Sequence, residues 1–265
     1  MRRAARHPSL SAPWPWLAAG SLMGLLIALV VWAPARWLAS AVLQASSQRL
    51  SLQDARGTVW TGSARWVLTG GQGSQDQQAL PGRVSWQLRP VWSGLHLALT
   101  ADCCTAQPVG MTATLSPGGT VEVAVQDGLS SWPASLLTGL GTPWNTIAPE
   151  GQLQFSTRAA TLTWAAGRLT MAGQAQIDAL GVSSRLSTLR PMGSYRITLQ
   201  GGASPSLNVS TLEGSLQLSG QGQWVGARLR FTGEAVATPD RQEALANLLN
   251  ILGRRMGERS IIKLG

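Results

Sequence analysis

EGQLQFSTRAATLTWAAGRLTMAG, residues 150–173, and EGSLQLSGQGQWVGARLRFTG, residues 213–233, decide the fold of this chain. In both stretches an acidic residue and a glycine precede apolar residues at every second position. A tryptophan close to a glycine turn follows, and each stretch closes on a glycine. Strict alternation predicts strands with one apolar and one polar face. The recurrence predicts an internal duplication, with two similar halves at about 48–140 and 141–265.

The same alternation continues outside these two stretches, for example in Val121–Val125 and Tyr195–Leu199. Turn sequences separate the alternating runs, at Leu115–Gly119, Ala165–Gly167 and Gly201–Pro205. Runs that recur about every 8–12 residues predict an antiparallel meander. We expect Ile261–Leu264 to be its last strand.

Three stretches follow a helical pattern instead. Ala35–Gln48 is compatible with a helix, Ser130–Leu140 places its apolar residues on one stripe, and Asp240–Leu252 repeats leucine at helical spacing. The stripe of the last helix is Leu245, Leu248, Leu249 and Leu252, and a basic turn of Arg254, Arg255 and Arg259 follows Gly253. Two alternatives stay open. The stripe packs on the sheet, or the helix and its basic turn dock a partner subunit or an anionic headgroup.

An apolar segment precedes the strands. Residues 14–33 include the uncharged run Leu17–Trp32, which is long enough to cross a bilayer as a helix at ~1.5 Å per residue. Tryptophans flank the run on both sides, as expected at the headgroup level, and these are Trp14, Trp16, Trp32 and Trp37. Arginines precede it, at Arg2, Arg3 and Arg6. The positive-inside rule then predicts a cytoplasmic tail at 1–13 and a transmembrane helix at 14–33, with a periplasmic β-rich domain at 34–265.

A cleaved signal peptide is the alternative to this anchor, because Ala33-Pro34-Ala35 has the small-x-small form of a cleavage site. The apolar run is longer than a usual signal-peptide core, and no polar region separates it from that site. An uncleaved anchor is therefore favoured. The predicted molecule is a single-pass inner-membrane protein.

Composition limits the function classes. With 44% hydrophobic residues and 12% charged residues, the chain is not of disordered composition. The net charge is +9, but beyond the N-terminus most arginines are scattered singly, as at Arg65, Arg83, Arg158 and Arg196. Without a basic stripe or a known motif, nucleic-acid binding is not expected.

Catalytic groups are scarce in the sequence. Of the two histidines, His7 lies in the N-terminal tail and His96 stands between two leucines of an alternating run. Ser135 has no elbow glycines around it, and neither a GxGxxG motif nor a phosphate loop is present. We therefore expect no enzyme, no catalytic, cofactor-binding or metal-binding residues, and no cofactor.

Cys103 and Cys104 are adjacent and have neither CxxC spacing nor a nearby set of histidines, so a zinc site is not expected. A vicinal disulfide in an oxidising compartment is one alternative. The other is a pair of small residues at a turn, because adjacent Cα atoms lie ~3.8 Å apart, below the usual disulfide range. The sequence leaves both open.

Tryptophan is unusually frequent, with 12 residues. Outside the membrane belts they are Trp60, Trp66, Trp86, Trp92, Trp132, Trp144, Trp164 and Trp224. Core packing and cross-strand pairing explain most of them. The alternative is an amphipathic surface that holds a partner strand, a lipid or a peptide.

The order of these features resembles the type II secretion system protein N family, also called general secretion pathway protein N. The resemblance covers nearly the whole chain and rests on GTVWTGSA at 57–64, VSW at 84–86, Arg89-Pro90, Glu150-Gly151, Trp164, Pro191-Met192-Gly193, the 214–233 unit with Trp224, and ALANLL before Gly253. It implies a non-enzymatic inner-membrane subunit of the machine that exports folded proteins across the outer membrane. The family has no catalytic residues to carry over.

Two functions from different classes are therefore expected. The first is a secretion subunit that acts through protein–protein contacts, with the inner-membrane platform and the secretin as partners. The alternative is a periplasmic lipid-handling or lipid-binding protein anchored in the inner membrane, because a long curved sheet with one apolar face can hold acyl chains.

Overall fold

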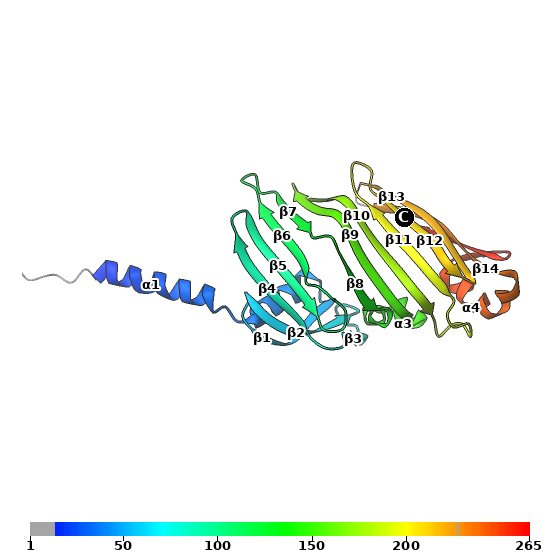
Figure 1. Ribbon diagram of the computed structural model, residues 1–265, viewed down its shortest axis with the longest axis horizontal. Helices are drawn as coiled ribbons and strands as arrows, with labels where there is room; N and C mark the ends of the chain where they lie inside the picture. The colour runs from blue at the N-terminus through cyan, green and yellow to red at the C-terminus, as the bar shows by residue number, and fades with distance from the viewer. Residues whose placement is uncertain (1–13, 227) are drawn as a thin grey trace, which may run out of the picture.

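One long antiparallel sheet forms the body of the protein. The computed structural model describes residues 14–226 and 228–265 (Figure 1). Within them sixteen strands pair in the order β1-β2-β4-β5-β6-β7-β9-β10-β11-β12-β13-β14-β16-β15, with β3 added to β2 and β8 added to β9. Strands that follow each other in the chain are mostly neighbours in the sheet. This confirms the predicted mainly β fold with an N-terminal apolar helix.

The bounds of the elements are as follows. The strands are β1 Leu50–Gly57, β2 Thr61–Thr69, β3 Gln77–Ala79, β4 Val84–Val91, β5 Gly94–Ala101, β6 Val109–Leu115, β7 Val121–Val125, β8 Gly128–Pro133, β9 Glu150–Ala165, β10 Arg168–Ser183, β11 Gly193–Gln200, β12 Ser206–Gly214, β13 Leu216–Val225, β14 Arg228–Ala237, β15 Arg254–Met256 and β16 Arg259–Leu264. The α-helices are α1 Trp14–Val31, α2 Ala35–Ala45, α3 Trp144–Ile147 and α4 Gln242–Leu252, and the 3-10 helices are η1 Ala134–Leu140 and η2 Pro239–Arg241. Residues 1–13, the predicted cytoplasmic tail, lie outside the described residues.

The register of the strands gives the sheet one apolar and one polar face, because residues directly opposite each other in an antiparallel pair share a face. Two rows of apolar residues across the strands show this. The first row is Leu88, Leu97, Met111 and Val125. The second row is Val123, Leu162 and Met171. A third row, Ile177, Ile197, Val209, Gly220 and Gly233, carries the same face to β14. The alternating residues that the sequence singled out therefore all lie on one face.

A bulge keeps this face continuous through the two longest strands. The pairing of β9 with β10 shifts between Ala172 and Gln174, where β9 carries an extra residue around Ala159. Gly173 has a φ of 76°, and a Cβ there would lie 2.0 Å from the carbonyl oxygen of Ala159. Only glycine fits this position without a backbone shift.

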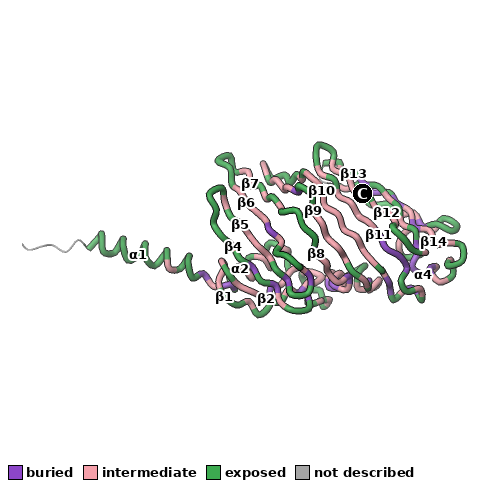
Figure 2. The backbone as a smooth tube through the Cα atoms, viewed as in Figure 1, coloured by how far each residue is buried: buried purple, intermediate pink, exposed green. Residues whose placement is uncertain are grey.

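Helices cover the apolar face at one end of the strands only. Helix α2 packs over β1 and β2, and its Ala35 lies in a buried cluster with Leu52, Ala64 and Trp86. The 3-10 helix η1 contributes Leu136 to a second cluster, and α4 contributes its leucines to a third. Figure 2 shows that the buried residues gather mostly along the margin of the sheet where these helices lie.

The helix expected at Ser130–Leu140 is wrong in its first half. Gly128–Pro133 is strand β8, which pairs with β9, and only Ala134–Leu140 is helical, as a 3-10 helix. Pro133 explains the difference, since proline has no N–H for an internal helical hydrogen bond and drives the preceding residue to an extended conformation. Trp132 therefore lies in a strand, where it stacks on Trp66 with ring centroids 6.4 Å apart.

The other expected elements are present with small changes. The helix at Ala35–Gln48 ends at Ala45, and the helix at Asp240–Leu252 begins as the 3-10 turn η2 and continues as α4. Ile261–Leu264 lies in β16, at the end of the chain. The two stretches that define the internal repeat each form a hairpin, with Trp164 opposite Leu169 and Trp224 opposite Leu229. The division into two similar halves stays a prediction.

Candidate interaction surfaces

Four features outside the helix-covered core could serve a function. They are the apolar helix α1, its junction with the sheet, the uncovered part of the apolar face, and a cluster of arginines on the polar face. Helix α1 is the one helix in the described residues that is long and apolar enough to cross a membrane, with a mean hydropathy of 1.9. None of its residues is buried against the sheet.

The junction between α1 and the sheet is held by the loop that connects β1 to β2. The backbone N–H of Val59 donates to the carbonyl of Ala33 over 2.8 Å, and Pro34 forms an isolated bridge with Thr58. The indole Nε1 of Trp60 donates to the carbonyl of Val30, in the last turn of α1, over 2.7 Å. We call these residues, Val30–Ala35 and Gly57–Trp60, the anchor junction.

Trp86 supports the anchor junction from within the core. Its indole Nε1 donates to the carbonyls of Thr58 and Val59 at 3.3 and 3.0 Å, and the side chain is 2% exposed. A Cβ at Gly62 would lie 2.5 Å from the Trp86 ring, so glycine is needed where the ring crosses β2. The GTVWTG sequence at 57–62 and Trp86 thus form one packing unit.

The candidate cleavage site, Ala33-Pro34-Ala35, lies inside the anchor junction. Ala33 is 8% exposed and Ala35 is 1% exposed, and both flank the bridge of Pro34 to Thr58. Residues on both sides of the site therefore contribute to the packing of the folded domain. This packing supports an uncleaved anchor, which remains a prediction.

Part of the apolar face has no helix over it in the described structure. We call it the open apolar face; it consists of the strand segments nearest the hairpins that join β4 to β5, β6 to β7, β9 to β10, β11 to β12 and β13 to β14. Its side chains include Leu95, Met111, Leu115, Val123, Leu162, Trp164, Leu169, Met171, Leu199, Leu207 and Val209. Leu115 is 70% exposed and Leu169 is 60% exposed, while most of the others are half-buried by their neighbours in the sheet.

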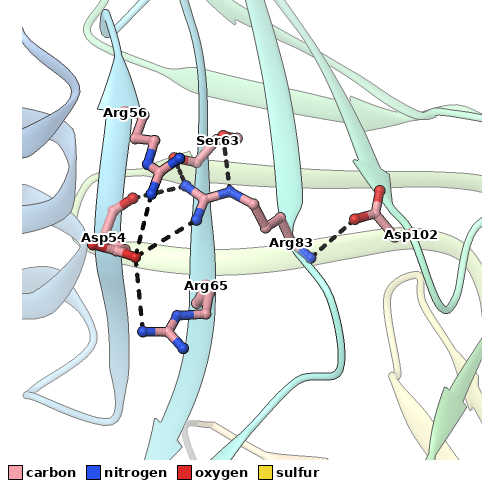
Figure 3. Close-up of polar contacts among 6 residues, drawn as sticks. All are labelled: Asp54, Arg56, Ser63, Arg65, Arg83 and Asp102. Atoms are coloured by element: carbon pink, nitrogen blue, oxygen red, sulfur yellow. Dashed lines mark hydrogen bonds and ion pairs between the residues drawn. The ribbon is translucent and has the colours of Figure 1, made fainter.

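The arginine cluster lies on the polar face at the β1 end of the sheet (Figure 3). The Oδ2 atom of Asp54 is 3.8 Å from Arg56, 3.7 Å from Arg65 and 3.9 Å from Arg83. Arg83 also donates to the carbonyls of Asp54 and Ser63, at 2.7 and 3.0 Å. One carboxylate thus faces three guanidinium groups, so this group, which we call the Asp54 cluster, carries excess positive charge.

Sequence reasoning missed the Asp54 cluster. Arg65 lies opposite Gln53 only through the β1–β2 register, and a bulge between Gln53 and Arg56 turns Asp54 toward the arginines, with a φ of 56°. The spacing of the four residues along the chain carries no signal of this arrangement. The one local sign of the cluster is Asp54 itself, an aspartate at the bulge of an alternating strand.

A second ion pair lies near the centre of the polar face. Arg196 Nε and an Nη atom donate to the two carboxylate oxygens of Asp178 at 2.8 and 2.7 Å, and Gln176 donates to the same oxygens. The hydrogen bonds from Arg196 hold the pKa of Asp178 below its ordinary value, against the opposing effect of burial. On the other face, burial in the α4 cluster raises the pKa of Tyr195.

The described structure brings no set of catalytic or metal-binding side chains together. Within residues 14–226 and 228–265, no three His, Cys, Asp or Glu side chains lie close enough together to hold a metal ion. The imidazole Nδ1 of His96 is 3.1 Å from the hydroxyl of Thr112, its cross-strand partner. Cys103 and Cys104 form a disulfide, the first of the two alternatives that the sequence left open for this pair. Cys104 packs in the cluster with Leu136.

The structure also separates the two alternatives for the C-terminal helix. Leu245, Leu248 and Leu249 are buried in the cluster beneath α4, so the stripe packs on the sheet. The basic turn forms the edge strands: Arg259 is 3.5 Å from Glu234, and Arg255 donates to the carbonyl of Gly257. The helix stripe is therefore unavailable for docking.

The tryptophans divide between packing and exposure. Trp66, Trp86 and Trp132 belong to the core clusters, as the packing interpretation expects. Trp92, in the turn between β4 and β5, is fully exposed, and Trp164 is half exposed at the tip of the β9–β10 hairpin.

A comparison with protein families finds one match. The family model described as Type II secretion system (T2SS), protein N matches residues 48–262. This range contains the Asp54 cluster, the open apolar face and α4. No curated protein matches the chain, and neither does any solved structure.

Proposed function

This chain belongs to the type II secretion system protein N family, and from that membership we propose that it is a non-enzymatic inner-membrane subunit of the secretion machine. It contributes to the export of folded periplasmic proteins across the outer membrane through contacts with other subunits. Helix α1 crosses the inner membrane with residues 1–13 in the cytoplasm, and the sheet lies in the periplasm. The family match, over most of the chain, is the observation that carries this proposal.

The anchor junction supports the role of a fixed scaffold. One contact joins α1 to the β1–β2 loop, two more join that loop to Ala33 and Pro34 directly after the helix, and Trp86 ties the loop to the core. A sheet attached in this way moves with the membrane helix and presents its faces at a set distance from the bilayer. The disulfide of Cys103 and Cys104 agrees with an oxidising compartment.

The Asp54 cluster is the surface that we assign to subunit contacts. Arg56 and Arg65 are 72% and 56% exposed, and the single carboxylate leaves them partly uncompensated. Such a patch suits an acidic segment of a partner, since complementary charge speeds association and selects the partner. The partners that fit this role are the inner-membrane platform and the secretin.

Crosslinking in cells tests the proposal. A tagged chain is crosslinked in its native host, purified in detergent, and its partners are identified by mass spectrometry. We expect other type II secretion subunits among the recovered proteins. If none is recovered while the tagged chain itself is abundant in the membrane fraction, the proposed function is wrong.

A charge-reversal pair tests the assigned surface. Changing Arg56 and Arg65 to Glu should reduce partner recovery several-fold, because the cluster then repels an acidic partner. Changing Arg228 and Arg230 to Glu makes the same change of charge on β14, at the far end of the sheet, and should leave recovery unchanged. Equal recovery from both double variants would contradict the assignment of this surface.

A further inference from the structure

We propose that the open apolar face binds the hydrocarbon chains of membrane lipids that enter it beside α1. This inference goes beyond the secretion role, because it concerns a ligand site on the opposite face of the sheet from the Asp54 cluster. It rests on the composition of the face, on its continuity with the anchor, and on its size.

The composition of the face is that of hydrocarbon. Among the described residues from β4 to β14, no side chain on the apolar face carries a charge. Its few polar side chains are Thr157, Tyr195 and Thr211, together with Ser130 of β8, which lies opposite Phe155. Cross-strand partners on the other face are polar instead, such as Thr112, Glu122 and Thr163. An exposed apolar surface of this extent is uncommon on a protein that has nothing to cover it.

The face begins at the membrane helix. Trp60 donates from its indole to Val30 of α1, and its carbonyl accepts a hydrogen bond of 2.7 Å from the N–H of Leu88 in β4. Leu88 lies opposite Leu97 and therefore belongs to the apolar face. An acyl chain that leaves the bilayer along α1 thus reaches apolar side chains within one strand. Helix α2 packs over β1 and β2, and the face beyond β4 lies outside its main contacts.

The face is long enough for lipid chains. Ten neighbouring strands, from β4 to β14 in sheet order, span nine intervals of ~4.8 Å, or about 43 Å. One leaflet of hydrocarbon is only ~15 Å thick. Two or more acyl chains can therefore lie across the strands.

A protein partner fits this face less well. Protein interfaces carry about one hydrogen bond per 100–200 Å² and a polar rim. The face from β4 to β14 offers side-chain hydrogen-bond partners at very few positions in the described structure, and its backbone groups are already paired in the sheet. Hydrocarbon needs no hydrogen bonds, so a hydrocarbon ligand on this face has no donor or acceptor left without a partner.

Photolabelling with a lipid tests this site directly. The purified full chain is placed in vesicles of phosphatidylethanolamine and phosphatidylglycerol that contain a phospholipid with a diazirine near the end of one acyl chain. After irradiation, labelled peptides are mapped by mass spectrometry. Label on α1 must appear in any case, because that helix lies in the bilayer. We expect additional label on Met111, Val123, Leu162 and Met171.

Two neighbouring substitutions provide the matched control. Val123 lies on the open apolar face and Ala124 on the polar face of the same strand. Val123→Asp should reduce labelling of the sheet several-fold, while Ala124→Asp should leave it unchanged, and circular dichroism checks the fold of both. Label confined to α1 in the unmodified chain would overturn the proposal. So would label spread equally over both faces.

Discussion

Single residues set the conditions under which the sheet is stable, and the pair of Asp178 and Arg196 is the clearest case. The carboxylate is largely buried, with 14% of its side chain exposed, and accepts both hydrogen bonds of the guanidinium fork. Hydrogen bonds from Arg196 lower the pKa of Asp178 in the folded protein. The stability from this pair is therefore complete above the unfolded pKa of ~3.9 and is lost as pH falls through the folded pKa.

Replacing Asp178 by Asn tests this linkage. At pH 7 the variant should be less stable by about 1.5–3 kcal/mol, the usual contribution of hydrogen bonds to a charged group. The difference in unfolding free energy should shrink as pH falls below ~4, where the parent carboxyl also takes up a proton. Glu122→Gln, at an exposed position on the same face, serves as the control. Denaturant unfolding at several pH values measures both, and a gap that persists at the lowest pH would contradict the assigned pair.

At the residue level the sequence predicts which face of the sheet a side chain lies on better than which side chain it contacts. Alternation at Val121–Val125 and Tyr195–Leu199 identified which side chains share a face, since that depends only on the strand period. The meeting of Asp54 with Arg83 depends on two strand registers and one bulge, and the state of Cys103 and Cys104 depends on their environment. None of these is encoded in local spacing.

The elements of the fold differ in how much they depend on their surroundings. The helix near the C-terminus follows from its own leucine spacing. Its predicted end at Leu252 is confirmed, and its first residues form the 3-10 turn η2 instead of α-helix. The segment Ser130–Leu140 does not form the helix that its own spacing predicts. Pro133 divides the segment, and β9 provides a strand partner for its first half. Which part of the apolar face is covered could not be predicted, because it depends on where the connecting helices pack.

Helix α4 should contribute strongly to stability. Leu248 is 1% exposed, so Leu248→Ala removes buried hydrocarbon and should cost about 2–5 kcal/mol. Asn250 lies on the exposed side of the same helix, and Asn250→Ala should change stability by less than about 0.5 kcal/mol. Thermal or denaturant unfolding distinguishes them. Equal small effects would show that the stripe does not pack on the sheet.

The β1–β2 loop offers a second comparison between elements. Trp86→Ala should destabilise the domain by about 3–5 kcal/mol, since the ring is buried and its indole holds Thr58 and Val59. Trp92→Ala, in the exposed turn after β4, should change stability by less than about 0.5 kcal/mol. Limited proteolysis should also show faster cleavage near Ala33 in the Trp86 variant alone. Unchanged cleavage there would mean that the anchor junction does not depend on Trp86.

The whole molecule combines an apolar helix that could span a membrane with a sheet that has two unlike faces. The polar face carries the arginine cluster that we assign to other subunits, and the open apolar face is the lipid site that we infer. The proposed function requires one crossing of the membrane with the sheet outside the cytoplasm. A reporter that works only in the periplasm should be active when fused after Gly265, and one that works only in the cytoplasm should be inactive. The opposite result would reverse the topology.

Secretion itself tests the central claim most directly. In a host strain that lacks this gene, the fraction of a type II substrate found in the culture medium is measured against the fraction retained in the periplasm. The account predicts that the folded substrate accumulates in the periplasm and that the full chain restores its release. A form without Leu17–Trp32, exported by a cleavable signal peptide, should restore little. Normal release of the substrate in the strain without the gene would contradict a role for this protein in secretion.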